Sequence, residues 1–461
     1  MPLCFIVADP NNIKIKQAMF KKPSRSNSTQ KPHNSPQVKK REIFAWAFFD
    51  FANSGYTTVV LTTIYSAYFV AVIAKENTLF EGTSATFLWT LSIGIANFLV
   101  LLSAPVIGAI SDYRGNKKYF LLFSTVGCVA FTALLALPGS NNLALAICFL
   151  IISAMCFSYG ESFIAAFLPE IASEHDMGKI SGYGWSLGYF GGLLTLGACL
   201  AYLYWARENH IPDSKSIPRT LYITALIFAL TALPTFLWLK ERAIRTTLPT
   251  NASYLWLGFK KVSGTLKDST HYRDLFRFLL CLTVYQSGVA AVIVLAAIYA
   301  QEVIGFDNEK LIILIMVVNL TAAIGAFLFG FLQDNLGLVK SLALALALWI
   351  AAILLILFSS DVSTFWFAAN LIGLAMGASQ SGGRALIGQL TPAKCTGEFF
   401  GLWGFANRLA AIIGPMSYGV INHFTQGNHK ASLVSTLLFF IIGLILLFRV
   451  NIQRGVEATA P

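Results

Sequence analysis

Residues 87–118 read FLWTLSIGIANFLVLLSAPVIGAISDYRGNKK. The first 24 residues of this stretch, Phe87–Ile110, carry no charge, and a polar loop with four charged side chains follows them at once. A helix needs about 20 apolar residues to cross the roughly 30 Å of hydrocarbon in a bilayer. The stretch therefore predicts a transmembrane helix that ends at a membrane surface.

The composition of the whole chain agrees with this interpretation. Of the 461 residues, 56% are hydrophobic and 12% are charged, whereas an average soluble domain has about 25% charged residues. A second block, Leu221–Leu239, has no charge in 19 residues. These proportions exclude a soluble enzyme, a nucleic-acid-binding protein and a disordered chain.

Twelve apolar blocks are long enough to span a membrane, which predicts an all-α integral membrane protein with twelve transmembrane helices. The blocks cover residues 43–74, 87–110, 119–138, 143–168, 180–204, 220–239, 275–301, 310–332, 338–358, 363–390, 399–423 and 431–449. Of the 33 Lys and Arg residues, 25 lie on one side of the membrane in this arrangement and six on the other. Because basic residues concentrate in cytoplasmic loops, both ends of the chain are predicted to be cytoplasmic.

The apolar blocks fall into two sets on either side of a basic loop. We expect a disordered basic cytoplasmic tail over residues 1–42, an N-terminal six-helix bundle over 43–239, a cytoplasmic basic linker over 240–274, a C-terminal six-helix bundle over 275–449 and a cytoplasmic tail over 450–461.

A repeated motif supports this division. It follows the second span as Gly108-x-x-x-Asp112-x-x-Gly115-x-x-Lys118 and the eighth span as Gly330-x-x-x-Asp334-x-x-Gly337-x-x-Lys340. The spacing is identical, and the two copies lie 222 residues apart, close to half of the chain. Self-similarity at a fixed offset indicates two halves built from one unit.

The first copy resembles the signature that transporters of the major facilitator superfamily carry between spans two and three, Gly-x-x-x-Asp-x-x-Gly-x-Lys/Arg-Lys/Arg. The matching residues are Gly108, Asp112, Gly115, Lys117 and Lys118. The resemblance implies two pseudo-symmetric six-helix bundles with nested inverted repeats. It also implies that spans one, four, seven and ten line a central cavity.

A narrower resemblance covers most of the chain from Ile43 onward. Trp46–Tyr56, WAFFDFANSGY, is similar to the first-span motif of the vacuole-effluxer-like branch of that superfamily. Later motifs that continue the similarity are FLPEI at 167–171, SGYGWSLGY at 181–189, ASQ at 378–380 with Arg384, EFFG at 398–401 and GP at 414–415. Yeast members of this branch are similar to vacuolar amino-acid exporters, so the resemblance implies transport of a small solute, with amino acids favoured.

One position departs from that branch. Its members usually carry Tyr-x-Asp-Gly-Val in the seventh span, whereas residues 285–289 of this chain read YQSGV. Serine replaces the acidic residue, so the resemblance supplies no cation-coupling carboxylate at this position.

Charged side chains in the hydrocarbon region cost roughly 2.5–3.5 kcal/mol each, so those that persist usually have a function or a partner. Four lie inside spans: Asp50, Glu161, Arg384 and Arg408. We expect Arg384 to bind a substrate carboxylate through two parallel hydrogen bonds, and Asp50 or Glu161 to bind an ammonium group. The alternative is that these residues form salt bridges between the halves and close the cytoplasmic side.

Other side chains complete the predicted site. Asp50 or Glu161 would carry a coupled proton, and Arg408 is expected to gate or support the cavity. Uncharged candidates for contact with the solute are Asn53, Tyr56, Tyr285, Gln286 and Gln380, with Ser54 and Tyr159 in addition. The same polar groups could instead join helices to each other.

The repeated loop motif is interpreted as a conformational latch and not as a ligand site. Asp112, with Lys117 and Lys118, would hold helices together and bias the equilibrium between inward and outward states. Asp334 and Lys340 are expected to mirror this latch in the second half.

The sequence thus predicts a secondary active transporter of a small solute, in the first place amino acids, with efflux by alternating access. No Gly-x-x-x-x-Gly-Lys-Ser/Thr loop occurs, which argues against intrinsic ATP-driven transport. No enzyme is predicted, since no metal-ligand cluster or nucleophile triad is apparent, and no cofactor or metal site, since no Cys-x-x-Cys pair occurs. The alternatives are transport of drugs, siderophores or other organic ions, and a non-transporting membrane receptor or scaffold.

The expected partners are the small-molecule substrate, a coupled proton or cation, and membrane lipid, without nucleic acid. We expect a monomer in a bacterial inner (plasma) membrane, with a vacuolar membrane as the alternative.

Overall fold

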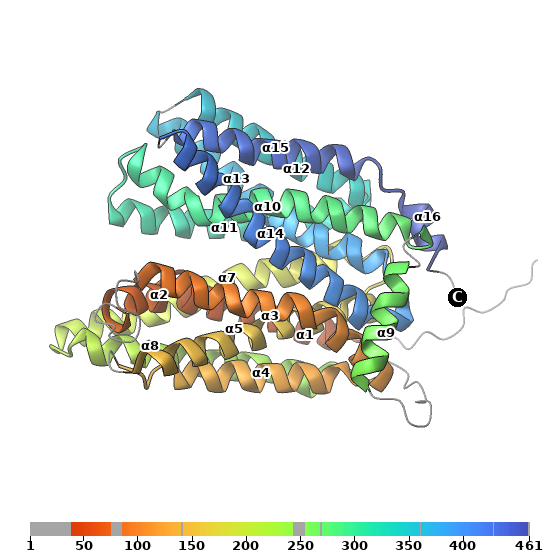
Figure 1. Ribbon diagram of the computed structural model, residues 1–461, viewed down its shortest axis with the longest axis horizontal. Coiled ribbons are helices and arrows are strands. Elements are labelled where there is room, and N and C mark those ends of the chain that lie inside the picture. The colour runs from red at the N-terminus through yellow and green to blue at the C-terminus, as the bar shows by residue number, and fades with distance from the viewer. Residues whose placement is uncertain are drawn as a thin grey trace, which may run out of the picture. The chain divides into compact units, whose positions relative to one another are not determined.

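The computed structural model describes residues 38–74, 85–139, 142–242, 254–267, 270–359, 361–426 and 428–459. All regular secondary structure in these ranges is helical, and the long helices run side by side (Figure 1). Residues 39–461 form one compact unit. Of the tail predicted over residues 1–42, residues 1–37 lie outside the described residues.

The first span is divided into several helical segments. They are α1 (Lys40–Tyr56), a π-helical segment (Thr57–Thr62), α2 (Ile64–Tyr68) and a second π-helical segment (Phe69–Ile73). The Thr62 hydroxyl donates to the carbonyls of Thr57 and Thr58, and the Thr63 hydroxyl donates to Thr58 at 2.5 Å. Side-chain bonds of this kind compete with the regular backbone ladder, which accounts for the irregular helix here.

The other spans are regular α-helices. In the N-terminal half they are α3 (Ala85–Arg114), α4 (Lys117–Leu134), α5 (Leu143–Ala165) with the short α6 (Leu168–Ile171), α7 (Met177–Glu208) and α8 (Asp213–Trp238). In the C-terminal half they are α10 (Arg273–Glu302), α11 (Asn308–Leu336), α12 (Leu338–Phe358), α13 (Val362–Gln389), α14 (Thr396–Phe424), which follows a short 3₁₀ turn (Ala393–Cys395), and α15 (His429–Leu447). The linker between the halves contains α9 (Tyr254–Lys267), and α16 (Ile452–Glu457) follows the last span.

Eleven stretches of the described residues are helices long and apolar enough to cross a membrane. The twelfth span is α14, which has 29 residues and packs against α3 and α10. Its apolar character is reduced by Glu398, Asn407 and Arg408, each of which meets a polar or charged partner. The predicted all-α fold with twelve transmembrane helices is therefore confirmed.

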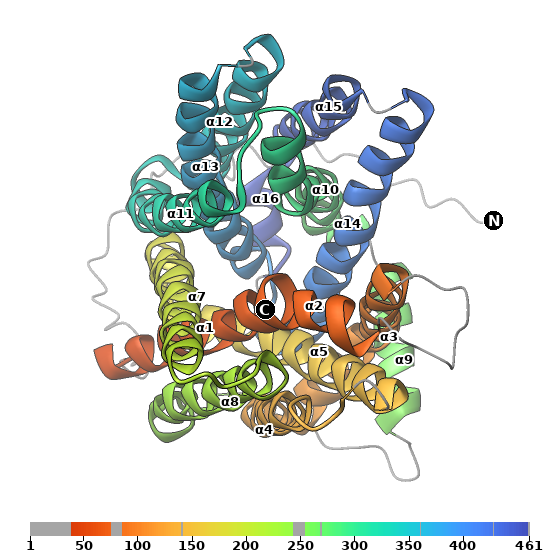
Figure 2. The same ribbon diagram turned by 90° about the vertical axis from the view of Figure 1, so that its left-hand side faces the viewer.

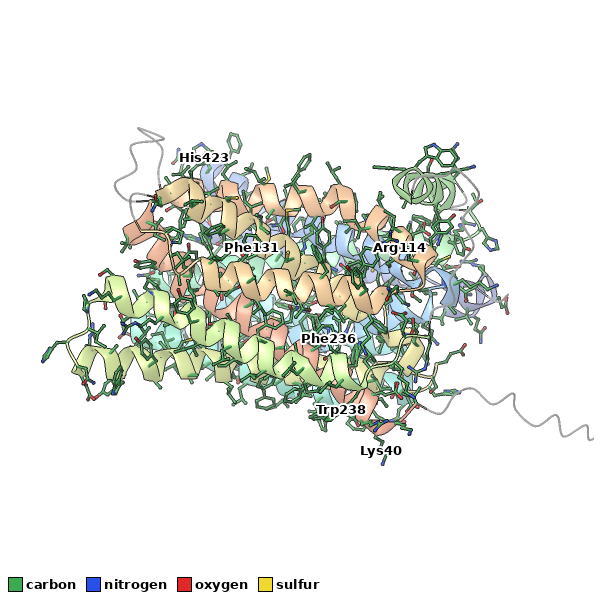
Figure 3. All side chains as sticks on the ribbon, turned by 90° about the horizontal axis from the view of Figure 1, so that it is seen from below. Lys40, Arg114, Phe131, Phe236, Trp238 and His423 are labelled. Atoms are coloured by element: carbon green, nitrogen blue, oxygen red, sulfur yellow. The ribbon has the colours of Figure 1, made fainter. Side chains whose placement is uncertain are left out.

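The two ends of the helices differ. Lys40 and Arg114 lie toward the end that carries α9, and His423 lies toward the opposite end (Figure 3). We call these the α9 end and the opposite end. The two sets of helices pack closely enough to form one unit, so the division into bundles at residues 240–274 stays a prediction from the repeat.

Two of the helix pairs that connect the halves each use both repeated motifs. In one pair α3 packs against α14, and in the other α11 packs against α7 (Figure 2). Helices α3 and α11 carry the two copies of the loop motif, whereas α7 and α14 begin with Gly178-x-x-x-Gly182 and Gly397-x-x-x-Gly401. In both pairs, therefore, the helix with the loop motif in one half packs against the helix with the glycine motif in the other half.

Glycine makes the close approach at both crossings possible. A Cβ atom on Gly108 would overlap the carbonyl oxygen of Gly397, and one on Gly182 would lie 2.6 Å from the carbonyl oxygen of Ala326. Small residues let helix backbones approach closely in membranes, where dispersion contacts and interhelical hydrogen bonds drive association.

We predict that Gly108→Ala lowers the melting temperature of the purified protein, because the added methyl group pushes α3 away from α14. Overpacking of this kind costs about 1–3 kcal/mol. Gly94→Ala, on the same helix, is the matched control, because nothing lies within 4 Å of a Cβ added there. Equal melting temperatures for the two variants would contradict this account of the α3–α14 contact.

Candidate functional site

Polar and charged contacts between the halves lie in three successive layers, numbered from the α9 end. The first contains the two loop aspartates, the second contains Asp50 and Arg384, and the third contains Glu161 and Arg408. Arg384 lies five residues before the end of α13, about 8 Å along the helix, and Arg408 lies twelve residues into α14, about 18 Å.

In the first layer, Asp112 of α3 binds the N-terminus of α14. Its carboxylate accepts hydrogen bonds from the backbone N–H groups of Gly397 at 2.8 Å and Glu398 at 2.9 Å. The first N–H groups of a helix have no partner within the helix, and the helix dipole favours a negative charge there. Asp112 therefore holds the start of a helix that belongs to the other half.

Asp334 makes the equivalent contact in the opposite direction. Its carboxylate accepts from the backbone N–H of Gly178 at 3.0 Å and from that of Lys179 at 3.2 Å, at the start of α7. Each half thus supplies an aspartate that caps a helix of the other half. The glycines in the turns after these aspartates, Gly115 and Gly337, have φ values of 56° and 88°, which favour glycine.

The motif lysines do not repeat in the same way. Lys117 is buried, pairs with Glu170 and donates to the hydroxyl of Thr396 in the other half. Lys118 instead ties α4 to the chain after α8, through the carbonyl of Leu239. Lys340 is exposed, and no hydrogen bond or ion pair joins it to any described residue. Asp334 thus makes a contact equivalent to that of Asp112, whereas Lys340 makes no such contact with the described residues.

The linker contributes a lysine that the sequence analysis did not identify. The Lys261 ammonium, on α9, lies 3.5 Å from a carboxylate oxygen of Glu398 and 3.9 Å from one of Asp112. Burial lowers the pKa of Lys261, but the neighbouring carboxylates outweigh this effect, so the pKa lies above its usual value. Nothing in the sequence marks this lysine among the other basic residues of the linker, because its role depends on how α9 packs on α3.

In the second layer, Arg384 of α13 is enclosed by the N-terminal half. It donates to Asp50 at 2.6 Å, to the carbonyl of Ser181 at 2.9 Å and to the Ser181 hydroxyl at 3.2 Å. Its guanidinium carbon lies 4.6 Å from the ring centre of Trp46 and 5.3 Å from that of Trp185. Cation–π contacts of this kind stabilise a desolvated guanidinium.

This arrangement is a salt bridge between the halves, as the alternative interpretation of Arg384 expects. The residue is 3% exposed and its donors already bind Asp50 and Ser181. Gly184 permits this fit, because a Cβ there would overlap the Asp50 carboxylate. In the conformation described, Arg384 is enclosed, whereas the Asp50 side chain is 12% exposed.

In the third layer, Arg408 of α14 donates to Glu161 of α5 at 2.6 Å. Both side chains remain accessible, 16% for Arg408 and 28% for Glu161. On the C-terminal side of this layer, Gln286 of α10 donates at 2.9 Å to both Gln380 and Asn407. The sequence analysis missed Asn407, although a polar residue beside Arg408 in an apolar span was a usable signal.

The two tyrosines expected to contact the solute lie inside single halves. The Tyr56 hydroxyl bonds with that of Ser153 at 2.8 Å, and its ring stacks on Phe157. Tyr285 is fully buried, against positions where Gly383 and Gly443 leave room for it. Both side chains contact their own half in this structure. Periodicity in a span does not distinguish the face toward the other half from the face toward its own.

The remaining neutral candidates divide in the same way. Asn53 is 7% exposed, and its carbonyl oxygen has no hydrogen-bond partner among the described residues. Tyr159 bonds with Ser103 at 2.5 Å within the N-terminal half. The carbonyl of Ser54 accepts from Thr58 one turn later in the same span.

We predict that Asp112→Ala increases the rate at which a maleimide labels Cys395, the residue that precedes α14. Loss of a capping side chain costs about 0.5–2 kcal/mol, so the start of α14 should open severalfold more often. Burial also raises the pKa of the Cys395 thiol, and opening removes this protection. Labelling is followed for the Cys395 peptide by mass spectrometry.

Asp361→Ala is the matched control for this experiment. Asp361 also caps a helix, accepting from the backbone N–H of Thr364 at 3.1 Å, but it does so within α13 of its own half. Cys395 labelling in this variant should equal that of wild type. If Asp112→Ala also leaves the labelling rate unchanged, Asp112 does not hold the two halves together.

Comparisons with known proteins agree with this architecture. The family described as "Vacuole effluxer Atg22 like" matches residues 82–460. A relative, "Uncharacterized MFS-type transporter YxiO" of Bacillus subtilis, is 28% identical over 405 residues, which cover 87% of this chain and 93% of that protein. "Autophagy-related protein 22-1" of Aspergillus niger is 22% identical over 298 residues, 60% of this chain and 48% of that protein. The chain thus spans about half the length of this fungal relative.

Solved structures show the same fold. The crystal structure of the human organic anion transporter MFSD10 (TETRAN) superimposes with a TM-score of 0.69 at 16% identity, covering 88% of this chain and 99% of that one. The family match extends over most of the chain, including both halves and the cross-half helix pairs. The chain belongs to the vacuole effluxer Atg22-like family of multi-pass membrane transporters in the major facilitator superfamily.

Proposed function

We propose that this protein is a secondary active transporter that moves amino acids across a membrane by alternating access, with export as the physiological direction. The observation that carries the proposal is the one-sided contact between the halves. The hydrogen bonds and ion pairs between the halves that are described above all lie within the three layers, from the α9 end to the Glu161–Arg408 pair. A transporter closed at one end and parted toward the other has this pattern.

The contacts in these layers suit a reversible closure. They consist of ion pairs and helix caps, which form or break as units when the halves rotate. An equilibrium between two such states shifts only through interactions that differ between them. The three layers supply interactions that are present when the α9 end is closed. A bound solute would supply the other interactions that differ between the two states.

Charge supports an orientation with the α9 end in the cytoplasm. This end carries Lys40, Arg114, Lys117, Lys260 and Arg454 in the described residues, and basic residues concentrate on the cytoplasmic side. Both termini would then be cytoplasmic. The Bacillus relative, 93% of which is covered, supports a bacterial plasma membrane as the location.

The substrate class rests on the family and on the chemistry of the interior. The family description names an effluxer of the vacuole, and the resemblance described in the sequence analysis favours amino acids. Acidic and basic side chains both lie in the region between the halves, which suits a solute with both charges. When Arg384 separates from Asp50, this carboxylate becomes available to a coupled proton.

The first test is counterflow in proteoliposomes loaded with pooled amino acids, with Arg384→Ala beside wild type. We predict that wild type exchanges at least one labelled amino acid and that Arg384→Ala loses at least about tenfold of this exchange. The variant leaves Asp50 without its partner, and breaking a buried ion pair is strongly destabilising for the state that contains it.

Arg219→Ala is the control, because Arg219 is exposed at the start of α8 and contacts only the Tyr202 hydroxyl among the described residues. It should transport as wild type does. Wild-type exchange by Arg384→Ala would overturn the gate assignment. Folded wild-type protein that exchanges no amino acid would overturn the substrate class, and organic ions would be tested next.

A further inference from the structure

The two arginine–carboxylate pairs between the halves differ in how completely they are satisfied. Arg384 binds Asp50 and Ser181 and lies between two tryptophan rings. Arg408 has one polar partner, Glu161, and its buried Nε atom has no hydrogen-bond partner among the described residues. A buried donor without a partner costs free energy, so it usually has a ligand or a function.

The Glu161–Arg408 pair is also accessible, although it lies deep in the helices. Helix α3 packs against both α5 and α14, the helices that carry the pair (Figure 2). The exposed fractions are 28% for Glu161 and 16% for Arg408, so neither side chain is fully enclosed by protein. Charges at this depth face a polar cavity or a partner when they persist.

An amide cluster in the C-terminal half has an unused acceptor. Asn407, the residue before Arg408 in α14, accepts from Gln286, which also donates to Gln380. The side-chain carbonyl oxygen of Gln286 is buried and has no partner among the described residues. The three amides come from α10, α13 and α14, so the cluster joins three helices of the half that carries Arg408.

We propose that Glu161, Arg408 and this amide cluster form the binding site for the α-ammonium and α-carboxylate of a zwitterionic amino acid. Arg408 donates two parallel hydrogen bonds to the carboxylate. Glu161 accepts from the ammonium, and the Gln286 carbonyl oxygen accepts a second ammonium hydrogen. The inference rests on the proposed function and assigns the site for that function to residues other than Asp50 and Arg384.

Charge balance explains the preference for a zwitterion. In the structure, Glu161 and Arg408 neutralise each other. A zwitterion that enters between them gives each charge a new partner, so no charge is left unpaired. A simple amine would leave Arg408 without a partner, and a simple carboxylic acid would leave Glu161 without one, which is costly at low dielectric constant.

The site also links occupancy to the movement of the halves. Glu161 belongs to α5 of the N-terminal half and Arg408 to α14 of the C-terminal half. A bound amino acid replaces their direct contact with a bridge through the ligand. Binding therefore changes the distance between the two halves at this layer and biases the equilibrium on which transport depends.

The test measures recognition with an amino acid that wild type exchanges, its decarboxylated amine and its deaminated carboxylic acid. The variants are Arg408→Gln and Glu161→Gln, and the readouts are the apparent affinity and maximal rate of counterflow. We expect Arg408→Gln to weaken apparent affinity at least about tenfold, since a charge-assisted pair is lost, and to bind the amine as well as the amino acid. Glu161→Gln should instead accept the carboxylic acid as well as the amino acid.

Two exposed residues at the opposite end provide matched controls. Arg219→Gln and Glu302→Gln remove the same charges outside the three layers, where Glu302 contacts His429. Both should keep wild-type affinity and discrimination. If Arg408→Gln does not reach the membrane, Arg408→Lys replaces it in the experiment. Lysine keeps the positive charge and the pair with Glu161 but lacks the two-pronged geometry, so this variant should weaken the apparent affinity.

Each result decides the proposal. Variants that lower the maximal rate but keep apparent affinity and discrimination against both analogues would show that the pair is only a gate, and the proposal would be overturned while amino-acid transport stands. If folded wild type neither exchanges nor binds any of the common amino acids, the proposed function fails and the proposal fails with it. Loss of discrimination in opposite directions for the two variants supports the site.

Discussion

A charged side chain between membrane-spanning helices needs a partner, and in this protein the partner comes from the other half of the chain. Asp50 and Glu161 lie in the N-terminal half, and Arg384 and Arg408 in the C-terminal half. Each charge would be costly by itself in a low-dielectric interior. The contact between the halves at the α9 end follows from this requirement, together with the aspartates that cap helices across the boundary.

The internal repeat gives these contacts a common plan. Asp112 caps α14 and Asp334 caps α7, so equivalent residues bind equivalent helices in opposite directions. The glycines at the starts of α7 and α14 allow the backbone to approach closely enough for these bonds. The two crossings differ in their lysines. Lys117 pairs with Glu170 and Lys261 pairs with Glu398 near the α3–α14 crossing, and no equivalent pairs lie at the α7–α11 crossing among the described residues.

The closing contact and the proposed binding site use the same chemistry, an arginine paired with a carboxylate. They differ in how many partners surround the arginine. Arg384 is enclosed by Asp50, Ser181 and aromatic rings, which suits a contact that must exclude solvent. Arg408 has one carboxylate partner and remains accessible. The difference arises from their neighbours, since both residues are arginines paired with one carboxylate at 2.6 Å.

The sequence by itself determined the twelve spans, the repeated motif and the four charged positions, because long apolar blocks, fixed spacing and charges within them are properties of the chain alone. It did not determine that Arg384 pairs with Asp50, that Tyr56 and Tyr285 point into their own halves, or that Asn407 and Lys261 join the polar layers. Those facts depend on the rotation of each helix about its axis and on contacts between residues some 250–330 positions apart. Packing between the halves determines the helix rotations and these contacts. Neither can be read from the pattern along a single helix.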